Sequence, residues 1–137
     1  MQTSLGPFEQ IADGVFVAVA EPASVNIGLV VGNSSALVID TGCSPSHGAA
    51  IRQAAEAAAG VPVRAVMVTH WHWDHFFGLA GFAGMPSYGH ASLDTWLGSD
   101  GLAVSAAEVG VPVRDLVPPT HPFSLARVID LGDRRVE

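Results

Sequence analysis

The stretch VRAVMVTHWHWDH, residues Val63–His75, carries most of the structural information in this chain. Its first half has apolar residues at Val63, Ala65, Val66, Met67 and Val68, a segment of strand length, which predicts a buried β-strand over residues 63–68. Its second half places three histidines and an aspartate directly after that strand. Burying four such groups without partners would be costly, so we expect the four side chains to bind a shared ligand such as a metal ion. These candidate metal ligands are His70, His72, Asp74 and His75.

The spacing of the four side chains suggests more than one ion. Imidazole and carboxylate groups are ligands that Zn²⁺ and similar divalent ions prefer. Residues two apart share a face in an extended backbone, so His70 and His72 can hold one ion from the same side. Asp74 and His75 are adjacent in the chain and are expected to diverge. A second ion beside the first is then the economical explanation.

Three segments resemble one known family. The segment THWHWDH, followed by Gly78, is similar to the HxHxDH signature of the metallo-β-lactamase superfamily of binuclear metallohydrolases. Ala36–Gly42 resembles the strand of that superfamily that ends in Asp-Thr-Gly before a helix, and Val25–Val31 resembles the preceding strand. The resemblance covers most of residues 10–90 in the right order. The HxHxDH motif is highly specific, whereas the Asp-Thr-Gly strand alone is a weak signal.

The resemblance implies a fold of the α/β class, the αββα sandwich. It also implies a hydrolase that uses a metal-bound hydroxide on an ester, thioester, lactone or amide bond. His70 and His72 would bind the first ion, and Asp74 and His75 the second. Asp74 would also act in catalysis by orienting the attacking water, and Asp40 would orient a ligand imidazole or the motif loop. The expected cofactor is Zn²⁺, two ions per complete domain, with iron or manganese as alternatives.

Members of this family place three more ligands downstream of the motif: a histidine in a Gly-His turn, a bridging aspartate and a late histidine. The only Gly-His pair in this chain is Gly89-His90, which comes too soon, and no aspartate has the matching context. Residues 1–137 are therefore expected to be the N-terminal portion of a single domain, which binds metal weakly and is inactive on its own. Two alternatives stay open: a di-iron redox module of the same superfamily, and a non-catalytic fragment without the downstream ligands.

The composition limits the partners that this chain can have. The formal net charge is −7, and only 14 % of the residues are charged, which agrees with an apolar face that lacks its covering strands. The chain has no lysine, which excludes Schiff-base chemistry within it. There is no basic cluster for nucleic acid beyond Arg134-Arg135, no apolar stretch of membrane-spanning length and no signal pattern. We expect a cytoplasmic protein with a small-molecule substrate and an exposed apolar face that promotes homo-oligomers.

Turn and capping signals predict the other elements. Ser44 and Pro45 mark the start of a helix that ends before Gly60. Residues 98–124 are rich in Gly and Pro, and are expected to form a loop region with no more than a helical turn near residues 106–108. The remaining expectations are an antiparallel meander of strands at Gly14–Ala20, Val25–Val31 and Ser35–Asp40, a short helix at Phe76–Phe82, a strand at Pro86–Tyr88, a helix at His90–Leu97, and strands at Arg127–Leu131 and Arg134–Glu137.

Four residues near the motif also have a purely structural interpretation. Cys43 is the only cysteine, cannot form an internal disulfide, and is expected to be a small buried residue. Trp71 and Trp73 alternate with the candidate ligands, and core packing is favoured for them over substrate contact. Asp74 has a structural alternative as the N-cap of a helix that begins at Phe76.

Overall fold

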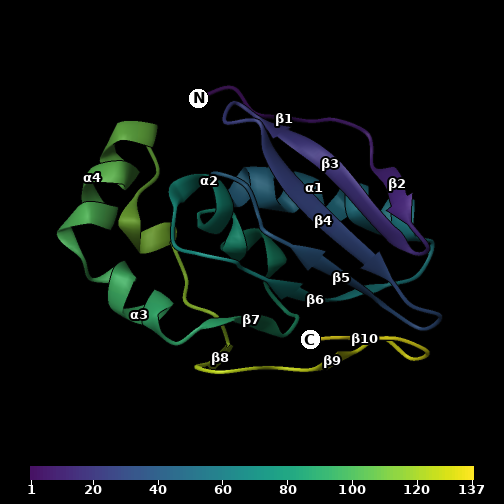
Figure 1. Cartoon of the computed structure of the whole chain (residues 1–137). Helices are drawn as coiled ribbons and strands as arrows, with labels where there is room; N and C mark the ends of the chain where they lie inside the picture. Colours follow the sequence, from purple (N-terminus) through teal and green to yellow (C-terminus); the bar gives the residue numbers. More distant parts are fainter.

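A mixed β-sheet with helices packed on one side organises the chain (Figure 1). The computed structural model describes residues 1–137. The strand order is β1-β3-β4-β5-β6-β7-β8, with β2 also paired to β3, while β9 and β10 form a separate two-stranded sheet. The pairs from β1 to β5 are antiparallel and those from β5 to β8 are parallel. The strands are β1 (Ser4–Leu5), β2 (Glu9–Ala12), β3 (Val15–Glu21), β4 (Val25–Val31), β5 (Ala36–Ile39), β6 (Val63–Met67), β7 (Ser87–His90), β8 (His121–Phe123), β9 (Ile129–Asp130) and β10 (Arg135–Val136).

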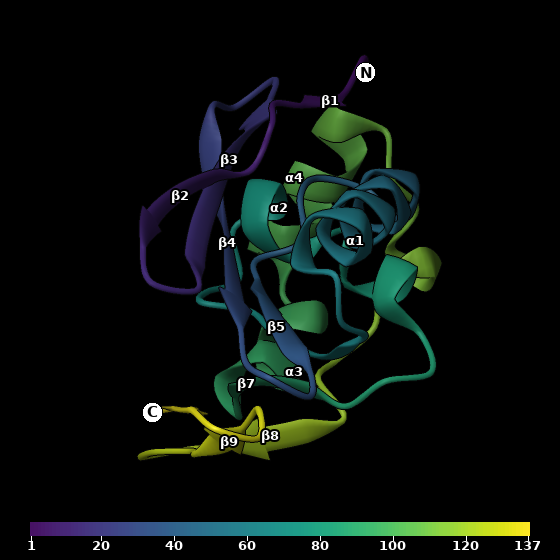
Figure 2. The ribbon, with the colours of Figure 1, turned by 90° about the vertical axis from the view of Figure 1, so that its right-hand side faces the viewer.

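The helices lie together on one side of the sheet, as Figure 2 shows for α1 and α2 beside β4 and β5. The helices are α1 (Pro45–Ala59), α2 (Trp73–Phe76), α3 (Ser92–Leu97) and α4 (Asp100–Val109), with 3₁₀ turns η1 (Leu79–Phe82) and η2 (Val113–Asp115). None of them combines the length and the apolar character that crossing a bilayer requires.

The antiparallel meander and the long helix expected from the sequence are confirmed. Strands β3, β4 and β5 pair in succession, and α1 has the expected bounds. Ser44 caps this helix, because its Oγ accepts a hydrogen bond from the His47 backbone N–H at 3.2 Å. Gly60 ends the helix in the left-handed conformation, at φ 67°, which glycine adopts without steric cost.

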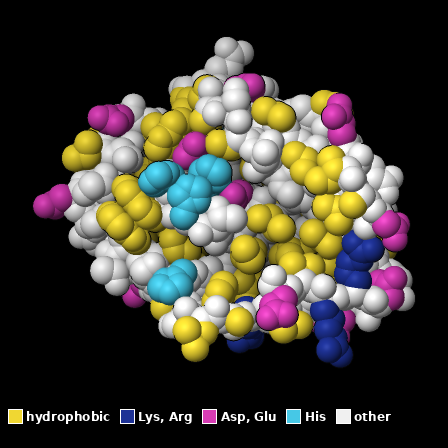
Figure 3. Space-filling view, in the orientation of Figure 1, with side chains coloured by type: hydrophobic (Ala, Val, Ile, Leu, Met, Phe, Trp, Pro, Cys, Tyr) yellow, Lys and Arg dark blue, Asp and Glu magenta, His cyan; other side chains and the backbone are white.

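The two faces of the sheet differ in how well they are covered. On the helix side, Ile27, Val38 and Val66 are fully buried in the main core. On the other side only the β9–β10 hairpin covers the sheet, through a small cluster that includes Leu37 and Leu131. Apolar side chains remain visible across that face in Figure 3. One helix layer on one sheet is half of an αββα sandwich, and the α/β class is confirmed.

Two local predictions are wrong. Residues 98–124 are not mainly loop, because α4 forms ten residues of regular helix, capped by the Ser99 side chain and ended by Gly110 at φ 75°. The prolines of this region all follow that helix, so they do not interrupt it. Asp74 is not a helix N-cap: α2 begins at Trp73, with His72 at the N-cap position, and Asp74 lies in the first turn. Strands β1, β2 and β8 were not predicted either, since two of them are very short and none has a clear alternating pattern.

Candidate metal centre

The candidate centre forms at the edge of the sheet where the parallel strands β5 and β6 end. The two strands pair in register up to Ile39 and Met67, so Asp40 and the residues after β6 meet at this edge. The backbone N–H of Asp40 donates to the Met67 carbonyl oxygen at 2.8 Å, which continues the pairing by one residue. Histidine side chains gather on the surface here, beside α2 (Figure 3).

All four candidate ligands lie next to one another. The ring centroids of His70 and His72 are 4.6 Å apart, and those of His70 and His75 are 4.2 Å apart. The Nε2 atom of His75 lies 3.7 Å from Oδ2 of Asp74. The expected divergence of Asp74 and His75 is therefore wrong, because the turn of helix α2 brings their polar ends together.

The carboxylate of Asp40 determines which nitrogen of His75 carries a proton. Asp40 is buried, at 4 % exposure, and its Oδ2 lies 2.7 Å from Nδ1 of His75. A carboxylate only accepts hydrogen bonds, so Nδ1 must be the donor. In the neutral imidazole this leaves the lone pair on Nε2, the atom that faces Asp74.

Thr69 links the same carboxylate to His70. Its hydroxyl has one proton, which it donates to Asp40 at 2.9 Å, while its backbone N–H donates to Oδ1 at 2.8 Å. The hydroxyl oxygen therefore accepts from Nδ1 of His70, at 2.8 Å. Nε2 of His70 is again left with the lone pair. Burial first, and then the imidazoles of His75 and His72, lower the pKa of His70 from the ordinary value of 6.5, which favours this neutral form.

The loop that carries Asp40 also holds the motif backbone in place. Asp40 has a positive φ of 71°, uncommon for a residue other than glycine and better tolerated by aspartate than by bulky residues. The next residue, Thr41, donates from its backbone N–H and from its hydroxyl to the His75 carbonyl oxygen, at 2.9 and 2.7 Å. The side chain and the backbone carbonyl of His75 are thus both hydrogen-bonded to the loop after β5.

Gly78, which follows the motif, allows a close backbone contact. A Cβ atom at this position would overlap the carbonyl oxygen of Thr41 and approach Gly48 of α1 at 3.1 Å. The backbone N–H of Gly78 donates to the Gly42 carbonyl oxygen at 3.1 Å. The absence of a side chain therefore lets the motif, the β5 loop and α1 pack together.

The donor atoms fit a divalent ion in type, but they do not yet form a closed site. No three of the His, Cys, Asp and Glu side chains converge as a metal-binding group in the structure. The pair Asp74 Oδ2 and His75 Nε2 is 3.7 Å apart, which is less than twice the usual zinc–ligand distance of about 2.0–2.1 Å. When His75 is neutral both atoms are acceptors, and a cation or a proton between them would stabilise this arrangement. The assignment of the four ligands, and of Asp40 as their orienting residue, stays a prediction.

Cys43 lies beside the centre but is enclosed by other groups. Nε2 of His47 lies 3.1 Å from the Ser4 carbonyl oxygen and must donate to it, so Nδ1 is free to accept from the Cys43 thiol at 3.2 Å. Cys43 and His47 are both nearly fully buried. Burial raises the pKa of the Cys43 thiol, which keeps it protonated. The expectation of a small buried cysteine is confirmed.

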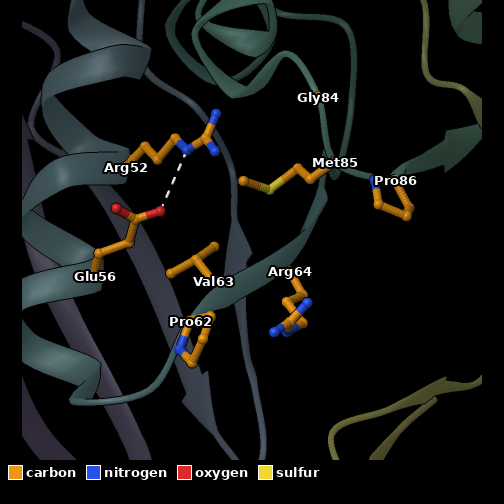
Figure 4. Close-up of a pocket in the computed structure, with 8 residues that line it drawn as sticks. All are labelled: Arg52, Glu56, Pro62, Val63, Arg64, Gly84, Met85 and Pro86. Carbon is orange, nitrogen blue, oxygen red and sulfur yellow. Dashed lines mark hydrogen bonds and ion pairs between the residues drawn. The ribbon is translucent and has the colours of Figure 1, made fainter.

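An open cavity of about 580 Å³ lies at the opposite end of β6 and is separate from this centre (Figure 4). Its charged side chains are Arg52, Glu56 and Arg64. Arg52 Nε lies 3.4 Å from Glu56 Oε1, and its Nη1 donates to the Ala83 carbonyl oxygen at 2.9 Å. None of the candidate ligands lines this cavity.

Comparison with known proteins agrees with the fold and the motif. The family model of the metallo-beta-lactamase superfamily matches residues 20–136, and the chain belongs to this superfamily. No curated protein matches the sequence at a significant level.

Similar solved structures include three metallo-β-lactamases. The enzyme from Erythrobacter litoralis, with β-mercaptoethanol in its active site, is 25 % identical, with a TM-score of 0.65 over 87 % of this chain and 50 % of that one. The protein from Hirschia baltica is 19 % identical, with a TM-score of 0.62 over 90 % and 55 %. The mono-zinc form from Pseudomonas aeruginosa is 20 % identical, with a TM-score of 0.64 over 87 % and 50 %. The chain therefore spans about half the length of the solved structures that it matches.

Proposed function

We propose that the full-length protein is a metal-dependent hydrolase of an ester, thioester, lactone or amide bond, with zinc as its metal. The observation that carries this proposal is the pair of acceptor atoms on Asp74 and His75, held 3.7 Å apart in a member of the metallo-β-lactamase superfamily. When bound, a divalent ion lowers the pKa of a water molecule and polarises the scissile carbonyl group. Because the chain spans half of its structural relatives, residues 1–137 alone are proposed to bind metal weakly.

The residues of this chain would divide the work as follows. His70 and His72 would hold one ion and Asp74 and His75 a second, each imidazole through a nitrogen with a free lone pair. Asp74 would bind through one oxygen and accept a hydrogen bond from the attacking water through the other. Asp40 would keep Nε2 of His75 unprotonated, because its carboxylate accepts from Nδ1 at 2.7 Å.

A carboxylic acid derivative is a better substrate candidate than a phosphodiester. Phosphoryl substrates are normally held by arginine or lysine side chains. The cavity that adjoins His70 has no arginine in its lining, and the chain has no lysine. The formal net charge of −7 further disfavours a polyanionic substrate.

The test is metal analysis and hydrolysis by variants of the full-length protein. His72→Ala should remove about one metal equivalent, since structural zinc sites need close to their full set of ligands. His121→Ala is the matched control, because His121 packs against Tyr88 and lies outside the cluster. Full metal content in a double His70→Ala, His72→Ala variant would rule out the proposed ligands.

The role of Asp74 has its own test. Asp74→Asn keeps the shape of the side chain but removes the negative charge. The kcat of the full-length enzyme should fall more than about tenfold, or roughly 1.4 kcal/mol of barrier. A smaller decrease, with metal content unchanged, would exclude a catalytic role for this carboxylate.

A further inference from the structure

A cavity of about 330 Å³ opens directly beside the candidate metal centre. It lies between the residues that follow β6 and helix α3. Pockets that bind small molecules have volumes of about 300–1,000 Å³, so this cavity suits one ring with a short substituent. The side chains that shape it are His70, Trp71, His90, Ser92, Leu93 and Trp96.

The wall of this cavity is a stacked pair of indoles. The rings of Trp71 and Trp96 are parallel within 8°, with centroids 4.1 Å apart, and both residues are only half-buried. The edge of the Trp71 ring meets His72 at a centroid distance of 4.9 Å. Helix α4 lies close behind the stack, since a Cβ at Gly101 would be 4.0 Å from an atom of each indole, which is ordinary van der Waals contact. The stack thus fixes a flat apolar surface at a set position beside two predicted ligands.

The polar rim of the cavity offers a hydrogen-bond donor. The Ser92 backbone N–H donates to Nδ1 of His90 at 3.1 Å, so in the neutral ring the proton lies on Nε2. This N–H is free to donate to an acceptor on a bound molecule. No carboxylate or guanidinium group lines the cavity, and its buried apolar floor is Leu93, at 2 % exposure.

We propose that this cavity binds a compact, uncharged aromatic group of the substrate, next to a carbonyl that would then lie at the metal centre. The proposal rests on the proposed hydrolase function and adds the class of substrate, an aromatic ester or amide of small size. A flat ring stacks on an indole face in an offset arrangement, as the two tryptophans already do with each other. The same lining gives no attraction to a phosphate or to a long polar chain.

Benzamide is the probe for this proposal, because it combines one aromatic ring with a neutral carbonyl acceptor. The chain has three tryptophans, and their indole ¹H–¹⁵N signals report on binding separately. Benzamide should shift the signals of Trp71 and Trp96 in a saturable way. The signal of Trp73, which does not line the cavity, is the internal reference. Acetamide, which has the same amide without the ring, should shift none of them at equal concentration.

Two variants locate the binding site. Trp96→Leu should weaken benzamide binding at least about tenfold, because it removes the stacking surface. Leu125→Ala is the control, since Leu125 lines a separate apolar cavity of about 360 Å³ beyond β8 and should leave the affinity within about twofold. If Trp96→Leu does not fold, intermolecular NOEs from the benzamide ring to Trp71 in the unmodified chain locate the binding site instead.

Three results would overturn the proposal: no shift of the Trp71 and Trp96 signals, equal affinity for acetamide, or NOEs to the Leu125 cavity alone. Benzamide binding requires no metal, and zinc is titrated separately. Failure of the full-length protein to bind zinc, with intact benzamide binding, would therefore contradict the hydrolase proposal. Zinc binding by the full-length protein without benzamide binding would contradict the aromatic pocket.

Discussion

Replacing Asp40 with asparagine should change the tautomer of His75 and weaken zinc binding. In the native chain, Asp40 accepts from Nδ1 of His75 and from both donors of Thr69. The amide oxygen of asparagine can still accept from Thr69, but its NH₂ group then faces Nδ1 of His75. Two donors cannot bond to each other, so His75 should move its proton to Nε2 and accept through Nδ1.

The size of the effect follows from the bond that is lost when zinc binds, because zinc on Nε2 returns the proton to Nδ1, where it meets the amide NH₂ instead of an acceptor. A hydrogen bond to a charged group contributes about 1.5–3 kcal/mol. Changing a residue that orients a metal ligand typically lowers metal affinity about 10–100-fold, which equals about 1.4–2.8 kcal/mol. The two ranges agree, so Asp40→Asn should weaken zinc binding by one to two powers of ten, roughly the loss of that one bond.

Two measurements check this prediction. Long-range ¹H–¹⁵N correlation spectra show which imidazole nitrogen carries the proton, and competition with a chelator gives the zinc affinity. Asp115→Asn is the control, because Asp115 is exposed in η2 and far along the chain from the motif. The reasoning is refuted if His75 keeps its proton on Nδ1 in the Asp40→Asn variant, or if the zinc affinity changes less than about twofold.

Three other properties of residues 1–137 can be tested by unfolding or by chromatography. Gly78→Ala should lower the free energy of unfolding by about 1–3 kcal/mol, because the added Cβ would overlap the Thr41 carbonyl oxygen. Gly98→Ala is the control and should have little effect, since its Cβ would lie 3.7 Å from the nearest atom. Equal urea midpoints for the two variants would contradict this prediction. Burial lowers the pKa of His47 below 6.5, so as the pH falls through that value the unfolded state takes up the proton first and stability is lost. His47→Gln should therefore lose less stability than the unmodified chain between about pH 7.5 and pH 5.5 in urea unfolding, and an unchanged pH dependence would argue against it. Association through the uncovered sheet face should make the chain elute at an apparent mass above 14.2 kDa in size-exclusion chromatography. Val19→Lys places a charge on that face and should shift the elution toward the monomer. A monomeric unmodified chain would contradict the proposed association.

Local signals were sufficient for the elements that carry the centre. Glycine and proline at turns marked the meander, and Ser44 with Gly60 marked both ends of α1. The prolines that follow α4 dominate the composition of residues 98–124 and obscure the signals of the helix's own caps. Ser99 and Gly110 are the same kind of pair as Ser44 and Gly60, and they were available in the sequence.

The hydrogen-bond partners at the centre were less accessible from sequence. Asp40 was recognised through family resemblance, but its contact with Thr69 depends on the parallel pairing of two strands with a helix between them. Sequence periodicity describes one element at a time and does not report which atoms two strand ends bring together. For the same reason, the stacking of Trp71 on Trp96 in α3 was not predicted.

The pairing of β5 with β6 decides which nitrogen of His75 carries its proton. Asp40 belongs to the end of one strand and His75 to the segment after the other, so their 2.7 Å bond exists only while both strands are in register. A slip of one residue would turn the carboxylate to the opposite face. The proton on Nδ1 of His75 should therefore stay in place only while these two strands remain paired.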